Sequence, residues 1–334
     1  MTILNHTRWL AATGLAAALA VTSAAAQAPG NLRIATTSPG SPWNILGVQV
    51  GEAMRENHPD LRTSSVSIGG SVANIVAVAR GEAQMAWSVD TAVEEAWHGL
   101  NQFPMEFRNI RAVGPFAAVP LQVQIRQDSA AQSMTDLARG AIAVGGPGWA
   151  TTDMNEAVMR SFGYSYDDIN AQGGQVHLVG HADWGPMLQD RVADAILHWG
   201  GIPSGVTMAM VENPGIRVLS FTDEEVARIL ESDVFARSYA FPMTLADGLY
   251  DGIPEGGANT LAYMSVALVH EDMDEDFVYE ITAAMFGGLI AGVYQDGVSG
   301  SMESVLAMNE QSSVPFHAGA ARWFAEQGIT VRTE

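Results

Sequence analysis

Short apolar strands alternate with amphipathic helices along most of the chain, and this order is the feature that most restricts its fold. Strands are predicted at 32–37, 63–68 and 84–89, and the helices that follow them at 43–57, 71–80 and 91–99. The turns between them are rich in Gly, Ser, Pro and Trp. Strands and helices repeated in this order build a mostly parallel sheet flanked by helices. The chain is therefore predicted to be an α/β protein.

The same unit recurs in the middle of the chain. Further strands are predicted at 140–146, 175–180 and 193–199, and helices at 153–162 and 182–190. The segments RGEAQMAWSV (80–89) and QDRVADAILHW (189–199) share a helix end, a polar bend and a buried strand. We interpret them as equivalent places in two similar lobes, and not as a short solenoid period.

Two long apolar strand candidates connect these lobes, at 112–129 and 259–273. Two crossings make the first lobe discontinuous, so that it encloses the second. The predicted organisation is a leader at 1–26, a first lobe at 27–121 plus 266–334, and a second lobe at 122–265. Hinges are predicted near 119–123 and 265–269.

Composition excludes several chemistries. The chain has no cysteine, and its 16 basic residues are all arginine. The absence of lysine excludes Schiff-base chemistry and the phosphate-binding lysine of a P-loop, while the absence of cysteine excludes disulfides and thiolate nucleophiles. The formal net charge of -21 argues against a nucleic-acid partner, because Lys and Arg supply most of that affinity.

The first 26 residues have the pattern of an export signal, with Arg8 ahead of an apolar run rich in Ala and Leu. Ala24 and Ala26 satisfy the A-x-A rule, so cleavage is predicted between Ala26 and Gln27. The alternatives are an ordinary Ala-rich helix and an uncleaved anchor. Because a lipoprotein would need a cysteine, we expect a released periplasmic protein that does not span a membrane.

In open α/β sheets, ligands bind beyond the carboxyl ends of the strands, where helices begin and point free N–H groups outward. The candidate loops are 37–43, 68–74, 87–91, 145–152 and 199–204. No Arg lies in them, so an anion would be held chiefly by backbone amides and hydroxyls. Their polar side chains are Ser38, Ser41, Ser71, Asn74, Ser88, Thr151, Thr152 and Ser204. Alternatively, Ser71, Thr151 and Ser204 only cap helices.

Five tryptophans lie at or beside these loops: Trp43, Trp87, Trp149, Trp184 and Trp199. Tryptophan offers a large apolar face and one N–H donor, which suits both a core and a ligand pocket. Trp43 and Trp149 are the stronger pocket candidates, since Gly, Ser and Pro flank them.

Three metal or nucleotide motifs are incomplete. GGPGWATT (145–152) lacks the third Gly or Ala of the dinucleotide fingerprint. Asp272, Asp274 and Asp276 imitate an EF-hand, but Phe277 stands where that loop needs Gly, so we expect them to cap a helix. His177 and His181 lack the H-E-x-x-H pattern. We predict neither a metal nor a cofactor.

The strongest enzyme signal is Gly69-Gly70-Ser71-Val72-Ala73, which is close to the G-x-S-x-G nucleophile elbow but ends in Ala. A secreted serine hydrolase using Ser71 would also need a histidine base. His177, His181 and His198 all belong to the other predicted lobe, which is poor geometry for a triad. We therefore predict a non-enzyme and keep the hydrolase as an alternative.

The segment GGSVANIVAVARGEAQMAWSVDTAVEEAWHG (69–99) resembles the substrate-binding proteins of TRAP transporters of the TAXI type. That family shows a Gly-Gly-Ser-x-x-Asn turn, a Gly-Glu-Ala step and then Ser-x-Asp. Similar order and spacing continue through the second-lobe loop GGPGWATT, the return strand VALVHEDMDEDFVYEITAAMF and the closing segment PFHAGAARWFAEQGI. The similarity covers nearly all of the chain after the leader.

The resemblance implies a two-lobed periplasmic binding protein, type II-like, that closes on a small organic acid and delivers it to a sodium-coupled TRAP permease. Its ligands would be a dicarboxylate, a keto acid or an amino acid such as glutamate or 2-oxoglutarate. With Trp43 and Trp149 facing in, a bulkier or aromatic carboxylate is open as well. A monomer is expected. A module that presents a ligand to a sensor kinase would use the same fold and pocket.

Carried onto this sequence, the resemblance places the ligand among residues of all five loops. They are Ser38, Ser41, Trp43, Gly70, Ser71, Asn74, Ser88, Asp90, Gly146, Gly148, Trp149, Thr151, Thr152, Gly200 and Ser204. The chain also departs from the family pattern. Its first loop, TTSPGSPWN, lacks the usual Gly-rich run, and Arg191 occupies a position usually held by Gly. The altered first loop bears on ligand identity.

Overall fold

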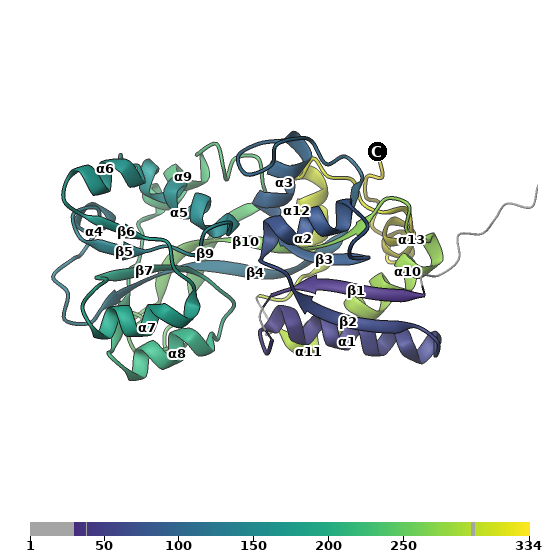
Figure 1. Ribbon diagram of the computed structural model, residues 1–334, viewed down its shortest axis with the longest axis horizontal. Helices are drawn as coiled ribbons and strands as arrows, with labels where there is room; N and C mark the ends of the chain where they lie inside the picture. The colour runs from purple at the N-terminus through teal and green to yellow at the C-terminus, as the bar shows by residue number, and fades with distance from the viewer. Residues whose placement is uncertain (1–29, 38, 295–297) are drawn as a thin grey trace, which may run out of the picture.

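The computed structural model of the chain describes residues 30–37, 39–294 and 298–334. The predicted leader at 1–26 and the candidate residue Ser38 lie outside the described residues. Figure 1 shows two lobes connected by the long strands β4 (Ile110–Arg126) and β10 (Ala258–His270). This architecture confirms the predicted two-lobed α/β fold.

Three parallel strands form the outer part of the first lobe: β1 (Asn31–Thr36), β2 (Arg62–Ser67) and β3 (Met85–Val89). β10 pairs antiparallel with β3 and with β4, which continues the sheet toward the other lobe. β3 and β10 are buried along almost their whole length, because helices cover both faces of the sheet.

The second lobe repeats this arrangement on a smaller scale. β5 (Ala141–Ala143) lies between β6 (Gln175–His177) and β7 (Ala195–Trp199), with all three parallel. β7 and β8 (Ile216–Val218) pair antiparallel with β4, and β9 (Ala240–Leu245) pairs antiparallel with β10. The main strand order is β2-β1-β3-β10-β4-β7-β5-β6.

The two long strands change partners as they pass between the lobes. β4 pairs with β10 up to Pro120 and with β7 from Leu121 onward. On β10, residues 258–263 pair with β9, whereas Ser265–Val269 pair with β3 inside the first lobe. The return crossing therefore lies several residues earlier than the predicted 265–269. Thr260 marks it, since its hydroxyl donates to the Leu121 carbonyl at 2.7 Å.

The helical segments that flank the first lobe among the described residues are α1 (Pro42–Asn57), α2 (Ser71–Ala79), α3 (Asp90–His98), α10 (Glu275–Ala284), the π-helix η1 (Met285–Leu289), α11 (Ile290–Val293), α12 (Met302–Gln311) and α13 (Ala318–Glu326). The second lobe carries α4 (Met134–Leu137), α5 (Ala150–Ser161), α6 (Tyr166–Ala171), α7 (His181–Gln189), α8 (Gly205–Glu212) and α9 (Asp223–Leu230). Asp274 caps α10 through the Phe277 N–H at 2.8 Å, as the sequence predicts.

The turns that follow α2 and α7 confirm the internal repeat. The N–H groups of Glu82 and Ala83 both donate to Ala77 O, and those of Val192 and Ala193 both donate to Met187 O. The turn needs a positive φ, which is +71° at Gly81 and +59° at Arg191. Arg191 therefore holds a left-handed backbone conformation that favours glycine.

The continuous helical stretch Glu275–Val293 is long and apolar enough to cross a membrane by length and composition, with a mean hydropathy of 1.3. Within it, Phe277, Val278 and Ile281 are buried, and α10 packs against α1 and α13. Core helices of soluble proteins have the same composition, so this stretch is only weak support for a membrane span.

Candidate functional site

The loops predicted from the sequence follow β1, β2 and β3 in the first lobe and β5 and β7 in the second, and loops of the two lobes meet. A Cβ placed on Gly70 would lie 3.9 Å from Cδ1 of Trp149 in the opposite lobe. Gly70 itself has φ +94°, a conformation that lets the main chain turn sharply into α2. The structure thus brings the second and fourth predicted loops together.

The helices that begin at this junction share one property. Among the described residues, α2, α3, α5 and α7 have no side-chain N-cap, and their N-cap positions hold Gly70, Val89, Trp149 and Gly180. All four follow parallel strands of the two lobes. The other helices that start a new helical segment are capped by Ser, Thr, Asp or His. An uncapped start leaves backbone N–H groups available to an outside acceptor.

The predicted hydroxyls divide into two groups. Ser41 caps α1 by accepting from Asn44 N, and Ser204 caps α8 by accepting from Thr207 N. Ser71 and Thr151 lie in the first turns of α2 and α5 and form no side-chain hydrogen bond to any described residue. Ser204 therefore caps a helix, as the alternative predicts, whereas Ser71 and Thr151 do not cap theirs.

Three further predicted polar residues are buried or form hydrogen bonds within the protein. Ser88 is fully buried within β3. Thr152 donates from Oγ1 to Gly146 O at 2.8 Å, which holds the second-lobe loop closed on itself. Asn74 is also fully buried, and its Nδ2 donates to Thr36 O at 3.2 Å and to Trp87 O at 2.9 Å. Asn74 therefore fastens the ends of β1 and β3.

Asn74 has a counterpart in the second lobe that the sequence pattern did not predict. Asn155 on α5 is fully buried and donates from Nδ2 to Val144 O and Leu197 O, both at 2.9 Å. Its Oδ1 accepts from Nε1 of Trp199 at 2.8 Å. The internal repeat could have identified it, because both asparagines lie in the first two turns of a helix that follows a Gly-rich loop.

The five tryptophans differ in burial, in the way that their flanking residues predict. Trp87, Trp184 and Trp199 are buried, whereas Trp43 and Trp149 are partly exposed. Trp43 donates from Nε1 to Ser265 Oγ at 3.1 Å and packs edge-on against Phe116. Trp149 packs edge-on against His181, with ring centroids 4.9 Å apart. Trp149 also lies across from Gly70, which makes it the better placed of the two for an interlobe ligand.

A second set of residues overlooked in the sequence lies beneath the fifth loop. Gln122, Gln124, His198 and Thr207 are each at most 2% exposed and form one hydrogen-bonded network. Gln122 donates from Nε2 to Gly200 O at 3.0 Å, and Gly200 N–H donates to Pro120 O. The network thereby fixes the loop after β7 to the crossing strand β4.

Acidic side chains line part of the junction between the lobes. Asp90 is fully buried and accepts a hydrogen bond from Tyr239 N of the segment before β9. Burial and the neighbouring Glu94 raise the pKa of Asp90 to about 7. Burial also raises the pKa of Glu95 to about 7, with a further rise from Asp153 of α5. Asp153 itself accepts from Gln102 Nε2 at 2.7 Å.

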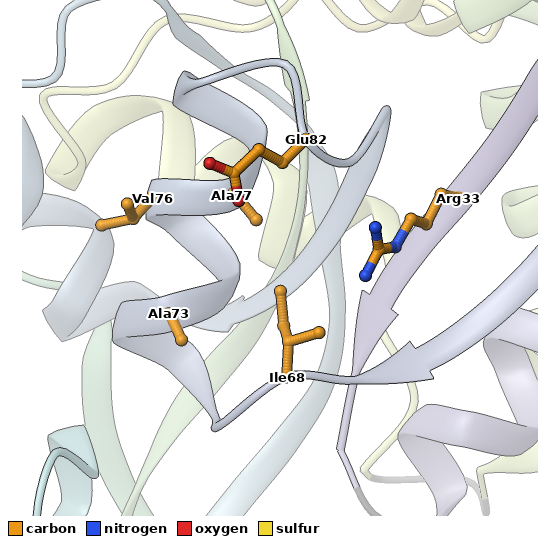
Figure 2. Close-up of a pocket in the computed structure, with 6 residues that line it drawn as sticks. All are labelled: Arg33, Ile68, Ala73, Val76, Ala77 and Glu82. Atoms are coloured by element: carbon orange, nitrogen blue, oxygen red, sulfur yellow. The ribbon is translucent and has the colours of Figure 1, made fainter.

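Two pockets are lined by residues of the first lobe alone. One, of about 230 Å³, is lined by Arg33, Ile68, Ala73, Val76, Ala77 and Glu82. Figure 2 shows the Arg33 guanidinium of β1 directed toward Ile68, with Ala73, Val76 and Ala77 along α2. The other, of about 370 Å³, is lined by residues around Arg111, Glu271 and His317. Neither contains residues from both lobes.

The described residues contain no group of three or more His, Asp or Glu side chains placed to hold a metal ion. Ser71, the nucleophile of the hydrolase alternative, is not paired with a histidine base among the described residues. Nδ1 of His198 is engaged by Gln124 and Thr207, and Ser71 has no hydrogen bond to a histidine. The geometry gives no support to the hydrolase alternative.

Comparison with known proteins agrees with the two-lobed fold. The NMT1-like family is matched over residues 34–328. The alkanesulfonate-binding protein SsuA from Xanthomonas axonopodis pv. citri, solved with MOPS, is similar over 90% of this chain and 85% of its own, at 16% identity and a TM-score of 0.53. The periplasmic binding protein BugD is similar over 90% of this chain and 99% of its own, at 13% identity and a TM-score of 0.52.

A third structure, XAC2383 from Xanthomonas citri bound to chloride ion, is similar over 89% of this chain and 100% of its own, at 14% identity and a TM-score of 0.51. At these identities the similarity establishes the fold. The chain has the two-lobed α/β fold of periplasmic binding proteins.

Proposed function

We propose a solute-binding function for this chain, which belongs to the NMT1-like family. It would capture a small organic anion between its lobes in the periplasm and deliver it to a membrane permease. The resemblance noted in the sequence favours a sodium-coupled TRAP permease of the TAXI type. The lobes proposed for this closure are those predicted from the sequence, with the end of the second lobe moved a few residues before 265, where β10 leaves β9.

One observation carries the proposal: among the described helices that start a new helical segment, the four without a side-chain cap begin near the junction of the lobes. A helix start carries roughly half a positive charge and several unpaired N–H groups, which together favour a bound anion. Ser71 and Thr151 stand beside two of these starts with hydroxyls that no described residue engages. Closure of the lobes would bring the N-termini of α2 and α5 together around one ligand.

The charge of the loops limits how that anion is held. They contain neither lysine nor arginine, so backbone amides and hydroxyls would replace the usual ion pair. An overall charge of -21 does not prevent this, because a local group of oriented amides can be positive within a negative surface. SsuA with MOPS and XAC2383 with chloride show that proteins of this fold hold anions.

A thermal-shift screen of dicarboxylates, keto acids, amino acids and aromatic carboxylates tests this function, because a ligand that binds only the folded state raises Tm. The double variant Ser71→Ala with Thr151→Val should weaken binding of any acid that the screen identifies. Ser64→Ala with Thr330→Val is the matched control, since both side chains are exposed and lie outside the five loops. An unchanged affinity in the first double variant would show that the ligand lies elsewhere.

A further inference from the structure

We propose that His198 contacts the ligand as a neutral hydrogen-bond donor, with its Nε2–H directed at a carboxylate oxygen of the bound acid. This inference rests on the proposed function and adds a specificity-determining residue to its site. His198 lies near the carboxyl end of β7, immediately before the fifth loop.

The network around His198 fixes which ring nitrogen carries the proton. Nε2 of Gln124 lies 3.3 Å from Nδ1 of His198. In the described orientation of the Gln124 amide, its NH₂ group donates, its Oε1 is buried without a partner, and Thr207 donates to Gln122 Oε1 at 3.2 Å. In this orientation Nδ1 accepts, and the proton of the neutral imidazole sits on Nε2. Thr207 supports this arrangement, as its Oγ1 accepts from Gln124 at 2.7 Å and lies 3.4 Å from Nδ1.

The opposite side of the ring is left open. Nε2 of His198 forms no hydrogen bond to a described residue. It differs from Nε2 of His177, which also has no partner but is completely buried. A Cβ on Gly200 would lie 2.2 Å from Nε2, so the absence of a side chain at 200 is what makes room for the ring. The donor therefore lies directly beside the main chain of the fifth loop.

Aromatic rings connect this donor to the junction of the lobes. His198 packs edge-on against Trp184 at 4.9 Å and against His181 at 5.5 Å, and His181 in turn packs against Trp149. Trp149 is the residue that lies across from Gly70 of the first lobe. The ring of His198 is thus connected to the junction by a row of contacts between aromatic rings, in which Trp149 lies nearest the other lobe.

The surroundings keep the imidazole uncharged. Burial, with a smaller contribution from His181, lowers the pKa of His198 to about 3. The groups packed around the ring are Gln122, Gln124, Thr207, Trp184 and His181, and no carboxylate is among the contacts that the structure describes. A neutral N–H donor suits an oxygen acceptor and does not bind an ammonium group.

The test uses purified protein labelled with ¹⁵N in its histidines and backbone amides, with sodium acetate as the simplest carboxylate probe. Long-range ¹H–¹⁵N spectra should show the Nε2–H tautomer of His198 without titration from about pH 5 to about pH 8. Added acetate should move the Nε2 resonance saturably, whereas equal sodium chloride should not. A protonated Nδ1, or titration near the ordinary histidine pKa, would overturn the inference.

Backbone amides separate this inference from the proposed function. If amides of Ser71 and Thr151 respond to acetate and His198 does not, the inference about His198 is wrong and the anion site stands. If neither responds, both proposals fail for carboxylates. His198→Phe should raise the half-saturating acetate concentration roughly tenfold, as expected for loss of one hydrogen bond to a charged group, while His198→Gln should lose less.

Discussion

The side chains of Asn74 and Asn155 make the same connection in the two lobes. Each is fully buried in an early turn of a helix, and each donates from Nδ2 to carbonyls of two neighbouring strand ends, Thr36 and Trp87 in one lobe and Val144 and Leu197 in the other. Parallel strands end without a hairpin to hold them, so a side-chain amide can fix the spacing of the loops that follow.

The two asparagines differ at Oδ1, and this difference predicts unequal stability effects. Oδ1 of Asn155 accepts from Trp199, whereas Oδ1 of Asn74 is buried and has no partner among the described residues. Asn155→Leu should therefore lower the free energy of unfolding by roughly 2–4 kcal/mol. Asn74→Leu should lower it by less, because it leaves fewer buried polar groups without a hydrogen-bond partner. Urea unfolding of the two variants measures this.

A double variant isolates the contribution of the tryptophan. Trp199→Phe removes the N–H that Asn155→Leu would leave unpaired, so the additional loss caused by Asn155→Leu should shrink in that background. An equal loss in both backgrounds would show that the Trp199 hydrogen bond does not cause the difference.

The buried acids predict how stability depends on pH. The pKa of Asp90 and that of Glu95 are each raised to about 7 in the folded protein, mainly by burial. Between about pH 4 and about pH 7 the folded state then holds protons that the unfolded state releases, so stability falls as pH rises through this window. The free energy of unfolding should drop by roughly 5 kcal/mol between about pH 5 and about pH 8.

Asp90→Asn should flatten part of that pH dependence, because an amide cannot ionise. The exposed Asp190→Asn, at the end of α7, is the matched control and should leave the slope unchanged. Chemical unfolding at a series of pH values checks both. A slope that Asp90→Asn leaves intact would assign the effect to other groups.

Gly200→Ala should disturb the second lobe although it adds only a methyl group. The new Cβ would fall 2.2 Å from Nε2 and 2.5 Å from Cε1 of His198, whose ring is held by Gln124 and Thr207. We expect a loss of roughly 1–3 kcal/mol in unfolding free energy, as for other overpacked sites. Gly201→Ala, whose Cβ would meet no neighbour within 4 Å, should be nearly neutral. Equal effects would contradict the geometry.

Trp149 should report ligand binding by fluorescence. Its partly exposed ring lies between His181 and the loop at Gly70, so a ligand at the junction would change its surroundings. Titration with the acid that gives the largest thermal shift should change the emission, and Trp149→Phe should remove most of that change. A signal retained in Trp149→Phe would assign it to another tryptophan, with Trp43 as the next candidate.

Local patterns predicted the strands and helices of the repeated unit, but they did not predict α4, α6, α8, α9, β8 or β9. The predicted helix at 71–80 and the observed α2 (Ser71–Ala79) nearly coincide, because the glycine turn and the apolar spacing are local signals. The return crossing was predicted too late along β10, since an unbroken apolar strand does not show where it changes neighbours. Asn155 and the Gln122 to His198 network were missed because their roles come from groups distant in sequence.

The sequence by itself determined the two-lobed α/β fold, the internal repeat and the loops at the strand ends, since these depend on periodicity and on turn residues that act over a few positions. Only the tertiary structure decided which hydroxyls remain unbonded, which tryptophan faces the opposite lobe and which histidine tautomer the network requires. Those properties depend on atoms brought together from both lobes, and hydrogen bonding and burial act through space between such atoms.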